Sequence, residues 1–302
     1  MNADAHEGND FRQLRESGMR AGSSKSIGTG FVVTRDALAR GLIRLGVRPN
    51  HISVAGFVAN CAAAACLVIG AGCHAPWESG TTGVAPYYWP LLAAACLFAA
   101  GACDMLDGAV ARLGNLSTEF GGVLDSVLDR LSEIVVYLGV AVHFAMSGNV
   151  TNMALAIVAL GNGLMISYVK ARAEDCIVDC SVGFWQRGER SAAILLACLF
   201  AHVPVLLWQQ AVLPFFTFLL RVRYARAAIR AKQAGQQPPA RLRGRNVAGL
   251  LHPWRHPRGT IPYDLTVGFN IACLLALPWI HPVFYGAADP LGVWLAGALR
   301  PA

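Results

Sequence analysis

Residues 104–129 read DMLDGAVARLGNLSTEFGGVLDSVLD and place four aspartates, Asp104, Asp107, Asp125 and Asp129, in two otherwise hydrophobic stretches. An ionised carboxylate is costly in such surroundings unless a metal ion or a polar cavity receives it. Spacings of three and four residues return side chains to one face of a helix, so each pair points one way from its own helix. The connection between the two stretches is short, which lets the helices run antiparallel and brings both pairs together.

Four converging carboxylates predict a metal site. Oxygen-only ligands suit Mg²⁺ or Mn²⁺ far better than zinc. The nine cysteines do not predict a second site, because they are dispersed through apolar stretches and form no Cys-x2-Cys pair. We interpret them as small hydrophobic residues. Cys176 and Cys180, in a predicted cytoplasmic loop, are the one pair placed to react, and reducing conditions there argue against a stable bridge.

The composition places the chain among membrane proteins. Of its 302 residues, 55% are hydrophobic and only 14% are charged, and the mean hydropathy is +0.46. A helix needs about 20 apolar residues to cross the hydrocarbon core. The predicted fold class is therefore all-α integral membrane: a six-transmembrane-helix bundle with an N-terminal amphipathic interfacial helix over 28–45 and a candidate seventh, C-terminal hydrophobic helix. The predicted spans are Ile52–Gly72, Trp89–Ala111, Gly122–Met146, Asn152–Lys170, Arg190–Val203, Pro204–Leu220 and, as the seventh, Leu265–Ile280.

The basic residues predict the orientation. With the N-terminus cytoplasmic, the segments 73–88, 147–151 and 204–210 face outward, and they contain no Lys or Arg. Every basic residue except Arg300 then lies in a cytoplasmic segment or at a cytoplasmic helix end, as the positive-inside rule requires. The predicted location is the cell (inner) membrane, multi-pass, with the aspartates facing the cytoplasm. Topology and attraction to anionic lipid explain the net charge of +7, and no nucleic-acid partner is predicted, because no reader motif accompanies the charge.

The aspartates belong to a longer pattern, Asp-x2-Asp-Gly-x2-Ala-Arg-x8-Gly-x3-Asp-x3-Asp, which resembles the signature of the CDP-alcohol phosphatidyltransferases. These are integral membrane enzymes of phospholipid synthesis. Upstream, residues 45–53 (LGVRPNHIS) are similar to the family's entry to its first transmembrane helix. Downstream, residues 167–174 (SYVKARAE) and 187–190 (RGER) are similar to the branch that makes phosphatidylinositol phosphate, with Gln186 and Gly188 standing where that branch usually has Glu and Pro.

The resemblance implies a reaction. A phosphatidyl group passes from CDP-diacylglycerol to the hydroxyl of a phosphorylated alcohol, inositol phosphate, and CMP is released, with Mg²⁺ or Mn²⁺ as the cofactor. Glycerol 3-phosphate is the alternative acceptor, because it needs the same basic phosphate site. Two metal ions held by Asp104, Asp107 and Asp125 would clamp the nucleotide diphosphate. Asp129, also near the second ion, would act as the general base. The family further implies a homodimer in contact with membrane lipids.

By the same resemblance, further residues contact the substrates. Those near the CDP-lipid are Pro49, Asn50, Ser53, Gly108, Ala111, Arg112 and Gly121. Those near the acceptor's phosphate, for which Arg offers bidentate geometry, are Lys170, Arg172, Arg187, Arg190 and Arg223. Plainer interpretations stay open, because small residues also serve helix packing and basic residues at helix ends also snorkel or mark topology. Glu133 continues the stripe of Asp125 and Asp129, and we interpret it as a supporting residue or as a partner of Arg130.

Three regions are predicted along the chain. Residues 1–26 form a disordered cytoplasmic tail, residues 27–226 the CDP-alcohol phosphatidyltransferase membrane domain, and residues 227–302 a basic linker with a hydrophobic extension. The segment 73–88 is expected to be an external loop held at the interface by aromatic residues such as Trp77. No chemistry is indicated for that loop.

Functions of other classes fit the sequence less well. An ion-coupled transporter would carry ionisable residues near the bilayer centre, whereas these aspartates lie toward one edge of the bilayer, beside arginines. An inactive scaffold is disfavoured because all four aspartates of the pattern are present. Prenyl transfer also uses aspartate-rich helices, but its Asp-Asp-x2-Asp pattern does not occur in the chain.

Overall fold

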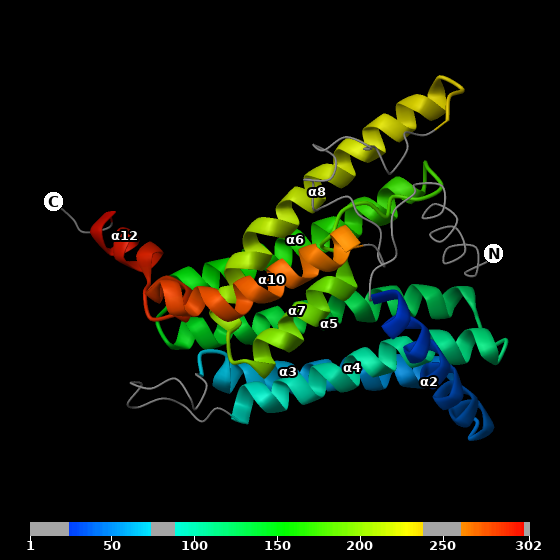
Figure 1. Ribbon diagram of the computed structural model, residues 1–302, viewed down its shortest axis with the longest axis horizontal. Coiled ribbons are helices and arrows are strands. Elements are labelled where there is room, and N and C mark those ends of the chain that lie inside the picture. The colour runs from blue at the N-terminus through cyan, green and yellow to red at the C-terminus, as the bar shows by residue number, and fades with distance from the viewer. Residues whose placement is uncertain (1–23, 74–87, 238–260, 299–302) are drawn as a thin grey trace.

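The structure, a computed structural model, describes residues 24–73, 88–237 and 261–298. Within these ranges the chain forms helices joined by short loops, and no strand occurs there (Figure 1). Most of the predicted tail, most of the loop that contains Trp77 and most of the basic linker lie outside the described residues, while residues 24–26, predicted as the end of the tail, begin the first described helix. The helices are α2 (Ser24–Arg44), α3 (Pro49–Gly70), α4 (Tyr88–Leu113), α5 (Glu119–Met146), α6 (Val150–Glu174), α7 (Arg187–Leu199), α8 (Val203–Gln233), α10 (Ile261–Ile280), α11 (Pro282–Tyr285) and α12 (Pro290–Ala298).

Among the described helices, five are long and apolar enough to cross a membrane: α3, α4, α6, α8 and α10, with mean hydropathies between 1.4 and 2.2. The predicted all-α, multi-pass membrane fold is thereby confirmed. α5 has the length, at 28 residues, but it carries the charged side chains of the candidate site. α7 has 13 residues, which at about 1.5 Å per residue cover only about 20 Å of a hydrocarbon core roughly 30 Å thick. The predicted fifth span is therefore too short to cross by itself.

Local sequence explains where the helices around the site begin. Pro49 opens α3, a position where its missing N–H leaves no partner unsatisfied. Thr118 caps α5, because its Oγ1 accepts a 3.0 Å hydrogen bond from the N–H of Gly121. The five residues between α4 and α5 reverse the chain, so these helices run antiparallel, as the sequence predicts (Figure 1).

α3 is the helix that holds the site together. It packs along both α4 and α5, whereas the direct packing between α4 and α5 is slight. α7 packs against α4, and α6 packs between α5 and α8. α2, the predicted amphipathic helix, crosses α4 (Figure 1) and buries Ala39 against Ile52 and Val110. The candidate site consequently lies where α4, α5 and α7 meet.

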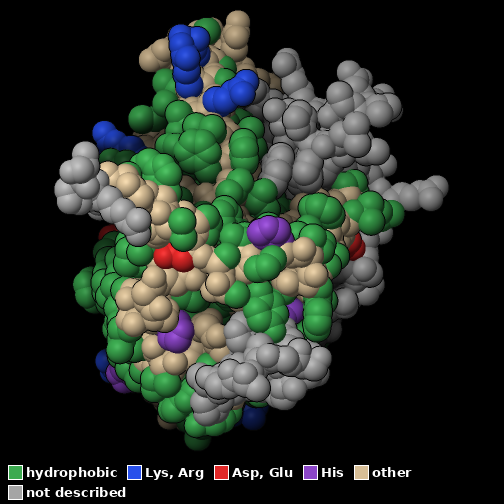
Figure 2. Space-filling model, turned by 90° about the vertical axis from the view of Figure 1, so that its left-hand side faces the viewer, with side chains coloured by type: hydrophobic (Ala, Val, Ile, Leu, Met, Phe, Trp, Pro, Cys, Tyr) green, Lys and Arg blue, Asp and Glu red, His purple; other side chains and the backbone are tan. Residues whose placement is uncertain are grey.

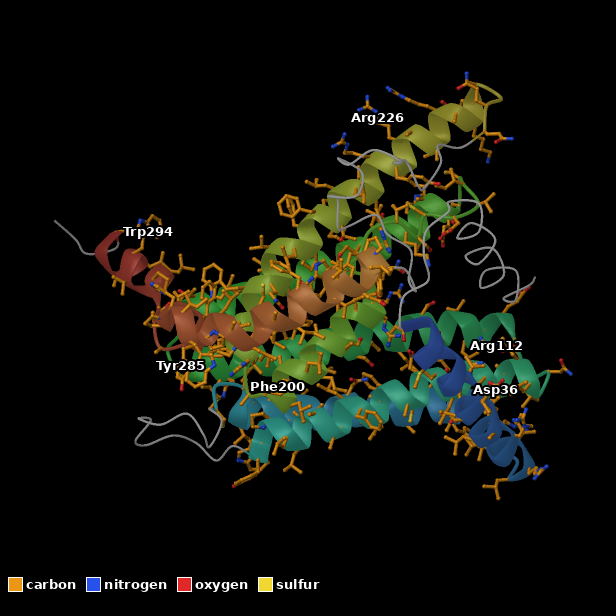
Figure 3. All side chains as sticks on the ribbon, viewed as in Figure 1. Asp36, Arg112, Phe200, Arg226, Tyr285 and Trp294 are labelled. Atoms are coloured by element: carbon orange, nitrogen blue, oxygen red, sulfur yellow. The ribbon has the colours of Figure 1, made fainter. Side chains whose placement is uncertain are left out.

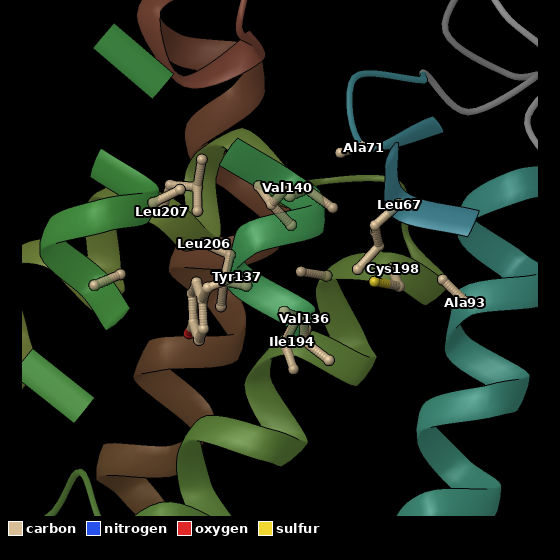
Figure 4. Packing of buried hydrophobic residues seen from close by; sticks show 14 of the residues in the cluster. Leu67, Ala71, Ala93, Val136, Tyr137, Val140, Ile194, Cys198, Leu206 and Leu207 are labelled. Atoms are coloured by element: carbon tan, nitrogen blue, oxygen red, sulfur yellow. The ribbon is translucent and has the colours of Figure 1, made fainter. Parts of the chain in front are cut away.

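The main hydrophobic core is built chiefly by α3, α5, α7 and α8, with residues of α4, α6 and α10 completing it (Figure 4). Leu67, Val140, Cys198 and Leu206 are fully buried in it. Small residues let the helices approach closely: a Cβ atom on Gly139 of α5 would lie 2.6 Å from the backbone oxygen of Ala64 in α3. Close packing through small residues is typical of membrane helices.

The C-terminal third of the chain differs from the sequence-based prediction. The turn between α7 and α8 covers residues 200–202 and not the predicted 204–210, which belong to α8. α8 has 31 residues and continues 13 residues beyond the predicted end at Leu220, so the start of the predicted linker is helical. The reason is propensity, because Arg, Ala and Lys, which dominate this stretch, favour a helix even outside the membrane.

Charged side chains are unevenly distributed between the two ends of the bundle. Arg112, Arg226 and Asp36 lie toward one end, and Tyr285 and Trp294 lie toward the other (Figure 3). Seen from the end that carries α12, the surface is largely hydrophobic, and basic side chains are few and lie at its edges (Figure 2). This difference between the ends is the one that the distribution of Lys and Arg predicts.

Candidate active site

Three of the four aspartates form one acidic cluster. α4 supplies Asp104, and α5 supplies Asp125 and Asp129 from successive turns. One carboxylate oxygen of each lies within 4.8 Å of the corresponding oxygens of the other two. The exposure of the side chains falls from 42% at Asp104 to 14% at Asp129. The cluster is therefore accessible to solvent at Asp104 and mostly buried in the bundle at Asp129.

Asp107 lies next to this cluster, and a residue of α3 fixes its side chain. It is 7% exposed, and its Oδ2 accepts a 2.6 Å hydrogen bond from the Oγ of Ser53 in α3. The same hydroxyl oxygen also lies 3.3 Å from the backbone oxygen of Pro49. Sequence reasoning predicts Ser53 as a contact of the CDP-lipid, and the structure places it as the residue that orients Asp107.

Arg187, the first residue of α7, bridges the two helices of the cluster. Its Nη1 lies 2.8 Å from Asp104 Oδ1, and its Nη2 lies 2.7 Å from Asp129 Oδ1. Arg130 adds a weaker contact, 3.6 Å from Asp129 Oδ2. One bidentate guanidinium thus faces three carboxylates, and the remaining negative charge favours a cation at this place.

The donor set fits a hard divalent ion. All the converging side-chain atoms are carboxylate oxygens, the ligands that Mg²⁺ and Mn²⁺ prefer over softer nitrogen or sulfur donors. Burial and negative charge together make an unneutralised cluster unfavourable. Asp104, Asp125 and Asp129 are therefore fit to hold such an ion, with Asp107 beside them on the same helix as Asp104.

Arg190 has a different place from the one that the sequence predicts. Its side chain is 2% exposed, and it makes a two-point ion pair with Glu133 of α5, at 2.7 and 3.0 Å. It also donates to the backbone oxygens of Trp185 and Gly163. With most of its N–H groups occupied inside the bundle, Arg190 joins α5, α6 and α7. Of the two interpretations of Glu133, the structure favours that of a supporting residue, because its partner is Arg190 and not Arg130.

The structure also explains a residue that sequence reasoning missed. A Cβ atom added to Gly163 of α6 would collide with the carboxylate of Glu133. Glycine at this place leaves room for the Glu133 and Arg190 pair in the geometry that the structure shows. No local signal in the sequence marks Gly163, because its partners are 30 and 27 residues away along the chain.

The other predicted phosphate contacts do not gather around Arg190. Lys170 lies 3.9 Å from Glu174, and Arg172 pairs with Asp175 at 2.9 Å on an exposed surface. Arg223 lies on the exposed side of α8, in a shallow depression that it shares with Arg226 and Arg230. Among the five residues predicted to contact the acceptor's phosphate, Arg187 is the one that contacts the acidic cluster.

The predicted CDP-lipid contacts are close together at one end of the bundle. A Cβ atom on Gly121 would lie 3.4 Å from Asn50 Oδ1, which shows how closely the starts of α3 and α5 approach. The guanidinium of Arg112 lies over Gly108, whose added Cβ would be 3.3 Å from Nη1. Ala111, one turn after Gly108, is partly buried and accepts the N–H of Leu116 through its backbone oxygen.

A cavity of about 330 Å³ extends from the acidic cluster along α4, α5 and α7. Its polar end is formed by Asp104, Asp129, Glu133, Arg187 and Arg190, and the rest is mostly apolar, with Leu97, Phe98, Val136, Ile194 and Leu195 among its lining residues. A cavity that is charged at one end and apolar at the other suits an amphiphilic ligand.

Two known proteins with a similar sequence are named as synthases of inositol phosphate lipids. Archaetidylinositol phosphate synthase of Methanothermobacter thermautotrophicus is 36% identical over 187 residues, which are 60% of this chain and 84% of that protein. Phosphatidylinositol phosphate synthase of Mycobacterium marinum is 32% identical over 194 residues, which are 64% of this chain and 75% of that protein.

Solved structures of a phosphatidylinositol phosphate synthase are also similar to this chain. The phosphatidylinositol phosphate synthase of Mycobacterium tuberculosis with CDP-DAG bound has a TM-score of 0.52 and 28% identity, covering 63% of this chain and 92% of that chain. The same synthase in complex with manganese and citrate has a TM-score of 0.50 and 27% identity. The family model for CDP-alcohol phosphatidyltransferase matches residues 47–223, a segment that contains all four aspartates. With more than half of its length matched and the acidic cluster assembled, this chain is a membrane-embedded enzyme of the CDP-alcohol phosphatidyltransferase family.

Proposed function

We propose that the protein transfers the phosphatidyl group of CDP-diacylglycerol to the hydroxyl of inositol phosphate and releases CMP. The observation that carries the proposal is the acidic cluster at the polar end of an otherwise apolar cavity. The similar proteins support the acceptor, because an inositol phosphate product is common to their names. The solved relative with CDP-DAG bound supports the donor.

The cofactor in this proposal is Mg²⁺ or Mn²⁺, as two ions held by Asp104, Asp107, Asp125 and Asp129. The oxygen-only donor set supports it, and so does the manganese in a solved relative. Bound ions supply charge neutralisation for the diphosphate and for the oxygen that leaves with CMP. The protein's own task is then to orient both substrates and to move one proton.

Asp129 is the proposed general base. Its carboxylate takes the proton of the acceptor hydroxyl, whose oxygen forms a bond to the lipid-bearing phosphorus while the bond from that phosphorus to the CMP oxygen breaks. Its low exposure, 14% for the side chain, supports this role, because water competes poorly there. Arg187 contacts the same carboxylate and is the basic residue best placed to receive the acceptor's phosphate.

The other predicted residues keep a part in the proposal, and for the basic ones that part differs from the predicted phosphate contact. Pro49, Asn50, Gly108, Ala111, Arg112 and Gly121 would surround the nucleotide, with Ser53 acting through Asp107. Lys170, Arg172 and Arg223 would attract the anionic acceptor without direct contact in the cluster, and Arg190 would hold α7 in place. The site would face the cytoplasm from the cell (inner) membrane, and the enzyme would work as a homodimer within a membrane domain over 27–226.

The test is a side-by-side comparison of acceptors. Purified protein in detergent or nanodiscs receives CDP-diacylglycerol and Mg²⁺ with inositol 1-phosphate, inositol or glycerol 3-phosphate, and the lipid product is identified by mass. Inositol 1-phosphate should be the preferred acceptor, because free inositol leaves Arg187 without a phosphate. Preference for glycerol 3-phosphate would establish the alternative acceptor, and preference for free inositol would rule out the phosphate site. EDTA should stop CMP release, and Mg²⁺ or Mn²⁺ should restore it.

A further inference from the structure

The C-terminal helix α10 reaches the first turn of α7, close to the active site. The hydroxyl of Tyr263 in α10 donates a 2.8 Å hydrogen bond to Glu189 Oε1 in α7. The ring of Tyr263 also lies 5.5 Å from that of Phe184, in the loop that leads into α7. α10 lies beyond the segment 47–223 that matches the family, so this contact belongs to an element that the family domain does not contain.

α7 separates the active site from α10. Gly188 and Ala192 line the catalytic cavity on one side and, on the other, a second cavity of about 390 Å³ between α7, α8 and α10. Arg187 and Glu189 are two residues apart on this helix, which at about 3.6 residues per turn places them on nearly opposite sides. Arg187 points to the aspartates, and Glu189 points to Tyr263.

A short helix that is held by two different neighbouring helices has a fixed rotation about its axis. On the α5 side, Arg190 pairs with Glu133; on the α10 side, Tyr263 holds Glu189. Because α7 has only 13 residues, a change in its rotation moves Arg187 directly relative to Asp104 and Asp129. Displacements of about 1 Å in such positioning groups cost on the order of a hundredfold in rate.

We propose that Tyr263 and Glu189 are positioning residues for the transfer reaction. The hydrogen bond between them sets the orientation of the first turn of α7 and so holds Arg187 beside Asp104 and Asp129. The inference rests on the proposed role of Arg187 in phosphate transfer. It gives the C-terminal extension a part in catalysis without placing any of its residues in contact with substrate.

α10 has other contacts that keep it docked when this hydrogen bond is lost. His202 Nδ1 lies 2.9 Å from the backbone oxygen of Leu274, and Gln209 Nε2 donates a 3.0 Å hydrogen bond to the backbone oxygen of Asn270. Both contacts connect α10 to α8 or to the turn before it, and neither involves α7. Gln209→Met is therefore a matched control, because it removes one hydrogen bond from α10 and leaves α7 untouched.

The experiment is a mutant cycle on the full-length protein, with CMP release measured as a function of acceptor and of CDP-lipid concentration. Tyr263→Phe and Glu189→Ala should each lower kcat/KM for the acceptor about tenfold and change the KM for the CDP-lipid much less. The double variant should be no worse than either single one. Glu189→Gln should retain most activity, because its amide oxygen still accepts the tyrosine hydroxyl.

A second background tests whether Arg187 transmits the effect. In an Arg187→Ala protein, Tyr263→Phe should cause no further loss, whereas a general weakening of the fold would add to it. Gln209→Met should keep the wild-type KM values. Three results would each overturn the inference. The losses of Tyr263→Phe and Glu189→Ala could be additive, Gln209→Met could lose as much kcat/KM as Tyr263→Phe, or Tyr263→Phe could have wild-type kinetics. If the wild-type protein prefers another acceptor, the proposed function fails, and the cycle is measured with that acceptor instead.

Discussion

At the scale of single residues, the function depends on where negative charge is concentrated and how it is neutralised. Asp104, Asp125 and Asp129 present oxygens within 4.8 Å of one another, and Arg187 neutralises only part of their charge. Asp107 is held apart by Ser53. Of the four proposed metal ligands, Asp107 is therefore the one whose orientation is set by a side chain of α3.

The metal ligands can be tested one at a time. Asp125→Asn keeps the shape of the side chain and removes one negative charge, so we expect Mn²⁺ binding, measured by calorimetry, to weaken and CMP release to fall. Loss of even an outer residue of a metal site costs about 10–100-fold, so the loss here should be at least about a hundredfold. Asp36→Asn, which removes a half-buried carboxylate paired with Arg35 on α2 and outside the cluster, is the control. Normal turnover of Asp125→Asn at low Mg²⁺ would contradict the assignment.

Asp129 has a proposed role distinct from that of the other carboxylates. Asp129→Asn should retain binding of the CDP-lipid but lose transfer by roughly 10²–10⁴-fold, the usual effect of removing a general base. The base acts on the acceptor hydroxyl and not on the nucleotide, so the two measurements should separate. A parallel loss of CDP-lipid affinity would instead make Asp129 chiefly a metal ligand.

The convergence of Asp104, Asp125 and Asp129 could be predicted from the sequence, whereas the partners of the basic residues could not, for a physical reason. The aspartates are marked by their own spacing on two neighbouring helices. The role of Arg190 depends on Glu133, 57 residues away, and on the space left by Gly163. An arginine at a helix end looks the same in a sequence whether it faces a phosphate or a buried carboxylate.

At the scale of helices, hydropathy marks the membrane spans but not the helix ends. α8 continues through Arg221, Arg223 and Arg226 to Gln233, because these residues end an apolar stretch without ending a helix. Arg221 is 2% exposed and donates to the backbone oxygens of Val182 and Ile166, so it serves the packing of α8 on α6. The predicted linker therefore begins with structured helix.

Gly163 of α6 leaves the space in which Glu133 of α5 pairs with Arg190 of α7. We expect Gly163→Ala to displace Glu133 from Arg190 and to destabilise the protein by about 1–3 kcal/mol, as is usual when atoms are forced into a packed interior. Gly161→Ala, two residues away on the same helix, is the control, because a Cβ atom there meets nothing within 4 Å. Thermal unfolding in detergent compares the two, and equal melting temperatures would show that the Glu133 site tolerates the methyl group.

At the scale of the whole molecule, the C-terminal extension is fastened at both ends of the bundle. Tyr263 bonds to Glu189 beside the active site. α10 has 20 residues, which at about 1.5 Å each span about 30 Å. Beyond its other end, Asp289 accepts hydrogen bonds from the hydroxyl and the N–H of Thr151 at the start of α6. Neither contact is visible in the sequence, because each joins the extension to a residue more than 70 positions away.

The contact between Asp289 and Thr151 predicts that the stability of the protein depends on pH. Partial burial raises the pKa of the Asp289 carboxyl, but hydrogen bonds from Thr151, Gly292 and Val150 outweigh it and hold the pKa below its ordinary value. A lowered pKa in the folded state means that the ionised carboxylate stabilises the fold above the unfolded-state pKa of about 3.9, and that this stabilisation is lost as the pH falls through the lowered folded-state value.

Asp289→Asn should accordingly lower the melting temperature by a constant amount at neutral pH, and the difference from wild type should shrink as the pH falls below about 4. Asn retains one acceptor oxygen but no charge, so the variant isolates the charged part of the contact. Asp175→Asn, which removes the carboxylate from an exposed pair with Arg172, is the control and should change the melting temperature little at any pH. A difference for Asp289→Asn that stayed constant down to pH 3 would mean that the extension is held by packing alone, and that its charge contributes nothing.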